Sequence, residues 1–354
     1  MTDSKLAIGL LRQETRHLAP ACEISRLDGF KFVSVLMERC GTPSRITKAV
    51  YNVALMSYAK SVASSAATLT ATMERMGENR RANATRTFLL PTKVERRRRY
   101  DSEDWDGEFE WGVGVDDLKL GRGTMEGASW TCGATVARHF ATRHMIRMGH
   151  ENPRAALAAG AACAPMALLY RDCQLTDGPG REPWDIIVPM AGGIACGGTE
   201  AVICKDLGSQ IWVGTQCSET IEGTAGPGLH LAASLRTFIT LSDIEGHRAL
   251  AVAAITAWMD EHHGPLGESA RDTHSRNPWQ PSKARIALVE SFMPIAHRVQ
   301  KSFSAWRRGF EAAGRNGCSD PEPKPPGDEL LHPWAAAIAA TATRIGMQQQ
   351  RRRG

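Results

Sequence analysis

The chain has 354 residues, of which 42% are hydrophobic and 23% are charged, so it can build a sizeable buried core and is not a disordered chain. Forty-three Lys and Arg against 38 Asp and Glu leave a formal charge of +5. This mild excess excludes a protein that coats a polyanion, but it permits a local basic site for a phosphate-bearing ligand. Aromatic residues make up only 6%, which argues against nucleic-acid binding by base stacking.

Cysteine usage and hydropathy indicate a cytoplasmic protein. The nine cysteines form no CxxC pair and are odd in number, which favours reduced thiols over a structural zinc site or a disulfide framework. The opening MTDSKLAIGLL has no basic region followed by a long apolar run, so we expect no signal peptide. The uncharged stretches around residues 155–170 and 186–199 are shorter than the roughly 18 to 20 apolar residues of a membrane span.

The first half of the chain alternates between predicted elements of both kinds. Residues 5–11 form a short apolar run that predicts a buried strand, and residues 27–39 predict an amphipathic helix. Residues 61–76 are rich in small side chains and predict a buried helix that stops at a glycine. Residues 136–148 have helical spacing and also end at a glycine. A basic run followed by an acidic stretch, over 96–110, predicts a solvated loop.

The second half continues this alternation. Residues 184–190, 201–204 and 210–214 predict strands, because they are short apolar runs rich in β-branched and aromatic residues. Residues 241–259 predict a strong helix, and residues 333–347 an alanine-rich one. Alternating strands and helices point to the α/β class, in which helices and strands pack in layers.

Six segments between residues 5 and 344 follow the order and spacing of one known enzyme superfamily. Residues 5–15 (KLAIGLLRQET) are similar to its opening strand, and residues 165–178 (PMALLYRDCQLTDG) to a segment of pattern P-L-x-L-L-D-C-x-x-x-D-G. Residues 331–344 (LHPWAAAIAATATR) look like its G-H-P-x-G-A-T-G-x-x-Q element. The sequence thus resembles the sterol-carrier-type branch of the thiolase superfamily, and the other matching segments are residues 121–149, 198–215 and 241–259.

The resemblance implies a thiolase-like five-layered αβαβα fold made of two similar halves, in a homodimer. It places the N-terminal half at residues 1–225, with an inserted substrate-loop region at about 100–185, and the C-terminal half at 226–354. It also implies that the protein acts in lipid or sterol metabolism on an acyl-coenzyme A thioester. The reaction would make or break a carbon–carbon bond next to the thioester, with no tightly bound cofactor and no metal.

The nucleophile position of the family falls on Ser61, in the segment SVASSAATL. In the family a cysteine stands there, at the N-terminus of a buried helix whose dipole lowers the thiol pKa. A serine at this position has no activated thiolate. Small residues that let a helix pack tightly explain the segment equally well.

Histidines supply the candidate proton-transfer groups. His332 precedes Pro333, as in the family's histidine that activates the nucleophile, although the flanking glycines of the family are replaced here. The alternative for His332 is a residue at a helix start, with proline at the first helical position. His274 stands at the spacing of the family's His-Asp motif, but no aspartate follows it. His262 and His263 compete with it, and an exposed loop histidine is the other explanation.

Three side chains of the segment 136–148 are candidates for binding the phosphates of coenzyme A. Arg138 and Arg143 carry guanidinium groups, which suit bidentate phosphate binding, and His144 is close to them in sequence. The alternative is a solvated helical face. Cys173 matches a family position that lines the cavity, and a buried free cysteine is its other explanation.

Departures from the family pattern leave several functions open. A related group in the superfamily also lacks the cysteine, cleaves β-hydroxyacyl-coenzyme A by retro-aldol chemistry and works with a small OB-fold partner. Loss of the cysteine and of the glycines also fits an inactive thiolase-fold scaffold or assembly subunit. Residues 6–20 (LAIGLLRQETRHLAP) further resemble the opening of microcystinase-type zinc peptidases, with Gln13 in place of their histidine ligand and Glu14 kept.

Overall fold

A mixed α/β architecture is seen in the computed structural model, which confirms the α/β class expected from the sequence. The structure describes residues 4–65, 67–97, 105–121, 123–177, 184–204, 209–213, 220–223, 228–244, 246–272 and 283–315. None of the helices in these ranges is long and apolar enough to cross a membrane.

Two long helices open the chain. α1 (Ser4–Cys40) is followed by the 3-10 turn η1 (Pro43–Arg45) and by α2 (Lys48–Ser64). The predicted helix over residues 27–39 is confirmed as part of α1. The strand predicted over residues 5–11 is wrong, because an apolar run this short does not distinguish a buried strand from a stretch of helix.

All strands of the described residues belong to one sheet, of order β1-β2-β3-β4-β9-β6-β5, with β7 beside β4 and β8 beside β7. The pairings are antiparallel, except that β4 and β9 run parallel. The strands are β1 (Thr68–Met73), β2 (Ala82–Arg97), β3 (Trp105–Leu120), β4 (Met125–Ala137), β5 (Asp185–Met190), β6 (Gly193–Cys204), β7 (Ser209–Val213), β8 (Thr220–Gly223) and β9 (Gly228–Thr240).

A further pairing closes part of this sheet on itself. Val94, Glu95 and Arg96 of β2 pair with the end of β6. Because β6 also pairs with β9, and β9 with β4, the strands β2, β3, β4, β9 and β6 form a closed circuit. The circuit therefore has an inner face and an outer face. Side chains alternate between the two faces along each strand.

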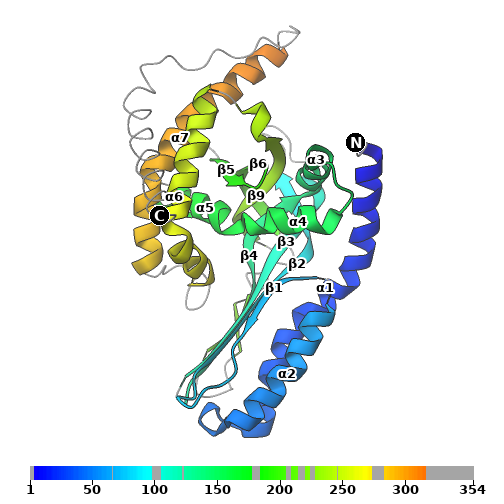
Figure 1. The fold of residues 1–354 in the computed structure, drawn as a ribbon, viewed down its shortest axis with the longest axis vertical. Helices are drawn as coiled ribbons and strands as arrows, with labels where there is room; N and C mark the ends of the chain where they lie inside the picture. The colour runs from blue at the N-terminus through cyan, green and yellow to red at the C-terminus, as the bar shows by residue number, and fades with distance from the viewer. Residues whose placement is uncertain are drawn as a thin grey trace, which may run out of the picture.

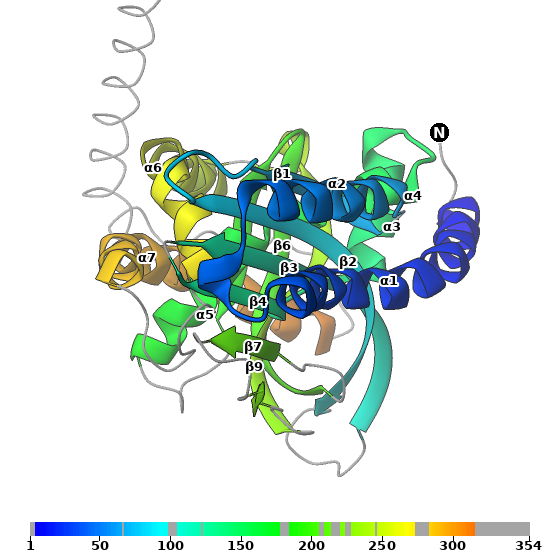
Figure 2. The ribbon, with the colours of Figure 1, turned by 90° about the horizontal axis from the view of Figure 1, so that it is seen from below.

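The lower halves of β2, β3 and β4 extend beyond the circuit, and with β1 they form an elongated arm that α1 and α2 cover (Figure 1). A hydrophobic core fills the space between these helices and the strands, and it includes Phe32, Leu36, Tyr51, Leu118 and Leu120. Seen from below, α1 and α2 run along the strands of the arm (Figure 2). The arm is thus a helical layer packed on a sheet.

The other helices pack around the upper part of the sheet. α3 and α5 contact β9, α4 contacts β4, and α6 and α7 contact α5 and β5. A second and larger core joins these helices to the sheet, with Phe140, Tyr170, Phe238 and Phe292 fully buried. The helices are α3 (Arg138–Met148), α4 (Pro153–Ala162), α5 (Ala164–Asp177), α6 (Gly246–Asp272), which follows the 3-10 turn η2 (Leu241–Asp243), and α7 (Lys283–Arg315).

Most other element predictions can be compared with the structure. The strands predicted over 184–190, 201–204 and 210–214 are confirmed within β5, β6 and β7, and the helix over 136–148 is confirmed as α3. The helix predicted over 241–259 begins later, at Gly246, after η2. Residues 333–347 lie outside the described residues.

Two predictions in the first half are wrong. The helix predicted over 61–76 ends at Ser64, and β1 follows, because alternating threonines in TLTATM favour an extended strand. The solvated loop predicted over 96–110 is strand wherever the structure describes it, since β2 reaches Arg97 and β3 begins at Trp105. The apolar residues of the run WGVGV alternate with glycine, which is a strand signal.

Candidate functional site

Three of the predicted site residues, Arg138, Arg143 and His144, lie on α3 at the upper end of the sheet. The side chains of Arg138 and Arg143 are exposed, whereas His144 is only 6% exposed. Within the described part of the chain, neither arginine has a carboxylate partner. The two arginines are therefore the predicted phosphate ligands that a solute can reach, and His144 belongs to the core.

The C-terminus of α3 is set by a glycine. Gly149 adopts a left-handed φ of 68°, which glycine adopts without steric cost. Its amide donates to the carbonyl of Ile146 at 3.3 Å, and the amide of His150 donates to that of Met145 at 3.1 Å. This pair of hydrogen bonds is the Schellman ending. It turns the chain back over the last turn of α3, which brings the ring of His150 to His144.

His144 and His150 form a hydrogen-bonded pair of imidazoles. Nδ1 of His144 and Nε2 of His150 are 3.1 Å apart, and the amide of Asn152 donates to Nδ1 of His150 at 3.3 Å. In the neutral pair the Nε2 proton of His150 therefore points to Nδ1 of His144. His144 also packs edge-on against the ring of Phe238 and stacks on Phe140. This packing fixes its position between the helix and β9.

Burial and the neighbouring imidazole lower the pKa of His144 from 6.5 to about 4. The uncharged form is therefore the one present at neutral pH. A neutral, buried imidazole offers no charge to a phosphate. The sequence did not single out His150, although a histidine just beyond a helix-ending glycine is placed to contact the last turns of that helix.

The exposed side of α3 carries a basic stripe, which we define as His139, Arg143 and Arg147, spaced four residues apart and so on one side of the helix. Burial and the charge of Arg143 lower the pKa of His139. Arg147 forms an ion pair with Asp243, which also accepts a hydrogen bond from Thr240 at 2.7 Å. Arg143 is thus the member of the stripe whose charge stays available to a ligand.

Ser61, the predicted nucleophile, lies in the last turn of α2 and is half-buried. The expectation that it stands at the N-terminus of a buried helix is wrong. The C-terminal end of a helix carries partial negative charge, which opposes a developing anion. The two predicted catalytic histidines, His274 and His332, lie outside the described residues.

A second polar group lies on the inner face of the strand circuit. Val136 packs on the helical side of β4, so the neighbouring Thr135 points to the inner face. The carboxylate of Glu110, 2% exposed, accepts hydrogen bonds from the hydroxyls of Thr135 and Ser234, the latter at 3.2 Å. Three strands thus contribute to one buried carboxylate site. The sequence did not indicate this site, because residues 96–110 were predicted to be a solvated loop.

Three of the described thiols are poorly suited to act as nucleophiles. Burial raises the pKa of Cys163, Cys173 and Cys196 to about 12, so all three are protonated at neutral pH. Cys173 is a residue of α5 that faces α7, and its sulfur is 3.9 Å from the carbonyl oxygen of Val289. The interpretation of Cys173 as a buried free cysteine is confirmed.

A cavity of about 500 Å³ lies at the far end of the arm, between η1, the β1–β2 turn and the β3–β4 turn. Its walls include the apolar Ile46, Met76 and Leu120 and the polar Ser44 and Arg80. None of the predicted site residues lines it. Among the described residues, no cluster of three or more His, Cys, Asp and Glu side chains is arranged to hold a metal ion.

The chain was compared with family models, with curated proteins and with solved structures. No family model, curated protein or solved structure matches it.

Proposed function

We propose that the protein binds an acyl-coenzyme A thioester through the exposed side of α3 and makes or breaks a carbon–carbon bond next to the thioester. The observation that carries the binding half of this proposal is the exposure of two arginines of α3, Arg138 at its start and Arg143 in the basic stripe. Both are exposed, and neither has a carboxylate partner in the described residues. A phosphate gains most from a guanidinium that is not already paired.

The charge of the surrounding helices supports an anionic ligand. Residues 4–18 of α1 hold three Lys or Arg and one Glu, and residues 138–162 hold four Arg and one Glu. The first part of α1 packs against α3 and α4, so these charges lie at the same end of the molecule (Figure 1). A local excess of positive charge attracts a phosphate-bearing solute and raises its association rate.

The chemical half of the proposal comes from the sequence resemblance. From the same resemblance we also propose the thiolase-like five-layered fold of two halves, a homodimer and a small OB-fold partner. His332 and His274 would move protons, and Ser61 would mark the place of the family's nucleophile. The raised pKa values of Cys163, Cys173 and Cys196 favour retro-aldol cleavage over thiolysis within this proposal, since retro-aldol chemistry needs no thiolate.

Ligand binding can be tested by calorimetric titration with coenzyme A and with a 3-ketoacyl-coenzyme A. We expect Arg143→Gln and Arg138→Gln each to weaken binding several-fold, and added salt to weaken it further, because the contact is electrostatic. Lys60→Gln on the arm is the matched control, since it removes an exposed cation elsewhere. Equal affinity of all three variants and the native chain would exclude α3 as the site.

Turnover can be tested by product analysis with two substrates. The protein is mixed with a 3-ketoacyl-coenzyme A plus free coenzyme A, and separately with a β-hydroxyacyl-coenzyme A. An aldehyde or ketone from the hydroxy substrate, lost in His332→Ala, is the expected result. Thiolysis products would assign the nucleophile to a cysteine, and no turnover with tight binding would leave only the binding half.

An assembly subunit is the second candidate. Val53 and Met56 on α2 are 57% and 65% exposed and lie three residues apart, so their side chains are neighbours on the helix surface. An apolar helix surface of this kind is typical of a protein that contacts other subunits. Oligomers that form without any turnover of either substrate would favour this function over the first.

A further inference from the structure

β1 is an edge strand that pairs with β2 alone among the described residues. Its central residues Thr70, Ala71 and Thr72 are exposed, and the strand TLTATM contains neither a charged residue nor a proline. Natural edge strands are usually protected by such residues, because an open edge pairs readily with another strand. β1 has β-branched residues that favour pairing and no protection of this kind.

The open backbone groups of β1 can be assigned from the register. The amide of Glu74 donates to the carbonyl of Asn83 at 2.8 Å, so this residue pair is hydrogen-bonded. Pairs alternate along an antiparallel ladder, which makes Thr72 hydrogen-bonded to β2 and turns the N–H and C=O of Ala71 and Met73 away from β2. These outward groups are the ones that a further strand would meet.

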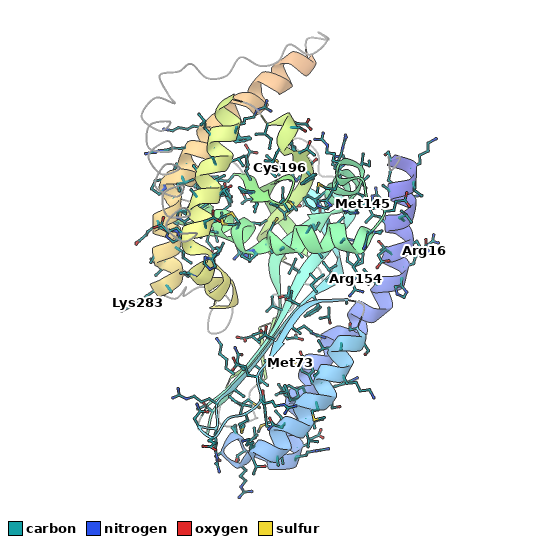
Figure 3. The ribbon with its side chains drawn as sticks, viewed as in Figure 1. Arg16, Met73, Met145, Arg154, Cys196 and Lys283 are labelled. Carbon is teal, nitrogen blue, oxygen red and sulfur yellow. The ribbon has the colours of Figure 1, made fainter. Side chains whose placement is uncertain are left out.

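The upper end of the same edge is closed. Arg154 projects from α4 towards β1 (Figure 3), and its Nη2 donates to the carbonyl of Thr68 at 3.0 Å. Leu69 is half-buried against the larger core. The accessible part of the edge is therefore short and is centred on Thr72.

The helix beside this edge is apolar on the same side. Asn52 of α2 accepts a hydrogen bond from the amide of Met76, just beyond β1, at 3.0 Å. Met56, Ala59 and Ala63 follow Asn52 at positions four, seven and eleven residues later, so they share its side of the helix. Met56 is 65% exposed. The open strand edge and the exposed apolar side of α2 thus border one surface.

We propose that a second copy of this chain pairs antiparallel with β1 about a two-fold axis at Thr72, which extends the sheet and lays α2 against its counterpart. The outward N–H and C=O groups are self-complementary about this axis. Those of Ala71 in one copy would bond to those of Met73 in the other, and those of Met73 to those of Ala71. The strand is uncharged, so two copies do not repel each other. The exposed side of α2 carries Met56 and Ala63 where the two helices would meet. This interface specifies the homodimer that the proposed function includes, and it does not depend on the ligand proposed for α3.

The strand contact is tested by Thr72→Cys in the full chain. Thr72 would face its own symmetry copy in a non-hydrogen-bonded pair, where Cα atoms are about 4.5 Å apart and a disulfide forms readily. We expect mild oxidation to give a covalent dimer. Thr85→Cys is the matched control, because Thr85 is the neighbour of Thr72 on β2, one strand inside the edge. The native chain reports the background from its own cysteines.

The free energy of association is tested by light scattering over a range of concentrations. We expect a dimer whose dissociation constant rises about tenfold or more in Ala71→Lys and in Met56→Glu. Ser57→Glu is the control on α2, since Ser57 is exposed and lies five residues after Asn52, about 140° around the helix from it. A monomeric native chain, or a dimer that these substitutions leave unchanged and Thr72→Cys does not trap, overturns the proposal.

Discussion

Arg86 and Asp116 are paired directly across β2 and β3, and both are buried. Nε of Arg86 donates to Oδ2 of Asp116 at 2.8 Å, and the hydroxyl of Tyr58 donates to the same oxygen at 3.1 Å. The guanidinium also lies over the ring of Phe88, 4.6 Å from its centroid. Because Tyr58 belongs to α2, this group connects the helical layer of the arm to its sheet.

Removal of the carboxylate should be costly. Asp116→Ala leaves the charge of Arg86 buried without its carboxylate, and we expect a loss of about 3–5 kcal/mol of unfolding free energy. Urea unfolding followed by circular dichroism measures it. The double variant Arg86→Met with Asp116→Leu removes both charges and should recover most of the loss. A single variant that costs less than about 1 kcal/mol would contradict the structural role of the pair.

The inner carboxylate of the strand circuit gives a second prediction. Glu110 accepts hydrogen bonds from Thr135 and Ser234, so Glu110→Gln would place an amide N–H₂ group against hydroxyl donors. We expect a loss of about 1–3 kcal/mol, the cost of a buried polar group without a suitable partner. Thr135→Val removes one donor and should cost less. Thermal unfolding of both variants and the native chain measures the two losses, and the midpoint should fall further in Glu110→Gln than in Thr135→Val.

Two adjacent glycines of β6 should differ sharply. A Cβ at Gly197 would meet the carbonyl of Ser234 well inside van der Waals contact, whereas the nearest atom to a Cβ at Gly198 is 3.5 Å away. Gly197 lies at a register shift in the antiparallel pairing of β6 with β9, and the two backbones approach closely there. Gly197→Ala should therefore destabilise the protein strongly and Gly198→Ala little. Equal unfolding midpoints would show that the two strands are not this close.

The His144–His150 pair predicts a dependence of stability on pH. The pKa of His144 is lowered to about 4 in the folded protein, against 6.5 in the unfolded chain. The unfolded state thus binds more protons between these values, and stability falls as the pH drops from about 6.5 to 4. The loss is at most about 3 kcal/mol, because one pKa unit corresponds to about 1.4 kcal/mol.

His144→Leu tests this directly, because leucine does not titrate and fits an apolar site. Unfolding free energies of the native chain and the variant are measured at several pH values in that window. Their difference should change with pH in the stated direction. A constant difference would show that His144 does not titrate between the two values.

Local signals in the sequence predicted some elements correctly. The helical spacing that ends at Gly149 marked α3, because a glycine with positive φ ends a helix through its own backbone. The β-branched run before Met190 marked β5 in the same way. Arg138 and Arg143 were placed on this helix correctly. Each of these features depends on residues a few positions apart.

Other features depend on contacts between distant residues, and the sequence alone did not determine them. The apolar run at residues 5–11 permits a strand as well as a helix. It is helical in the structure, where Ala7 and Leu11 pack in the larger core. Ser61 was matched to a helix start but lies at a helix end, since α2 begins earlier, at a threonine cap.

What the sequence by itself determined was the α/β class and the end of α3 at Gly149, because the first follows from the alternation of local patterns and the second from short-range geometry. The tertiary structure alone decided the closure of β2 on β6, the enclosure of Glu110 and the meeting of His144 with His150. Strand partners far apart in the chain are selected by packing and by the free energy of the whole sheet, and no local pattern encodes that choice.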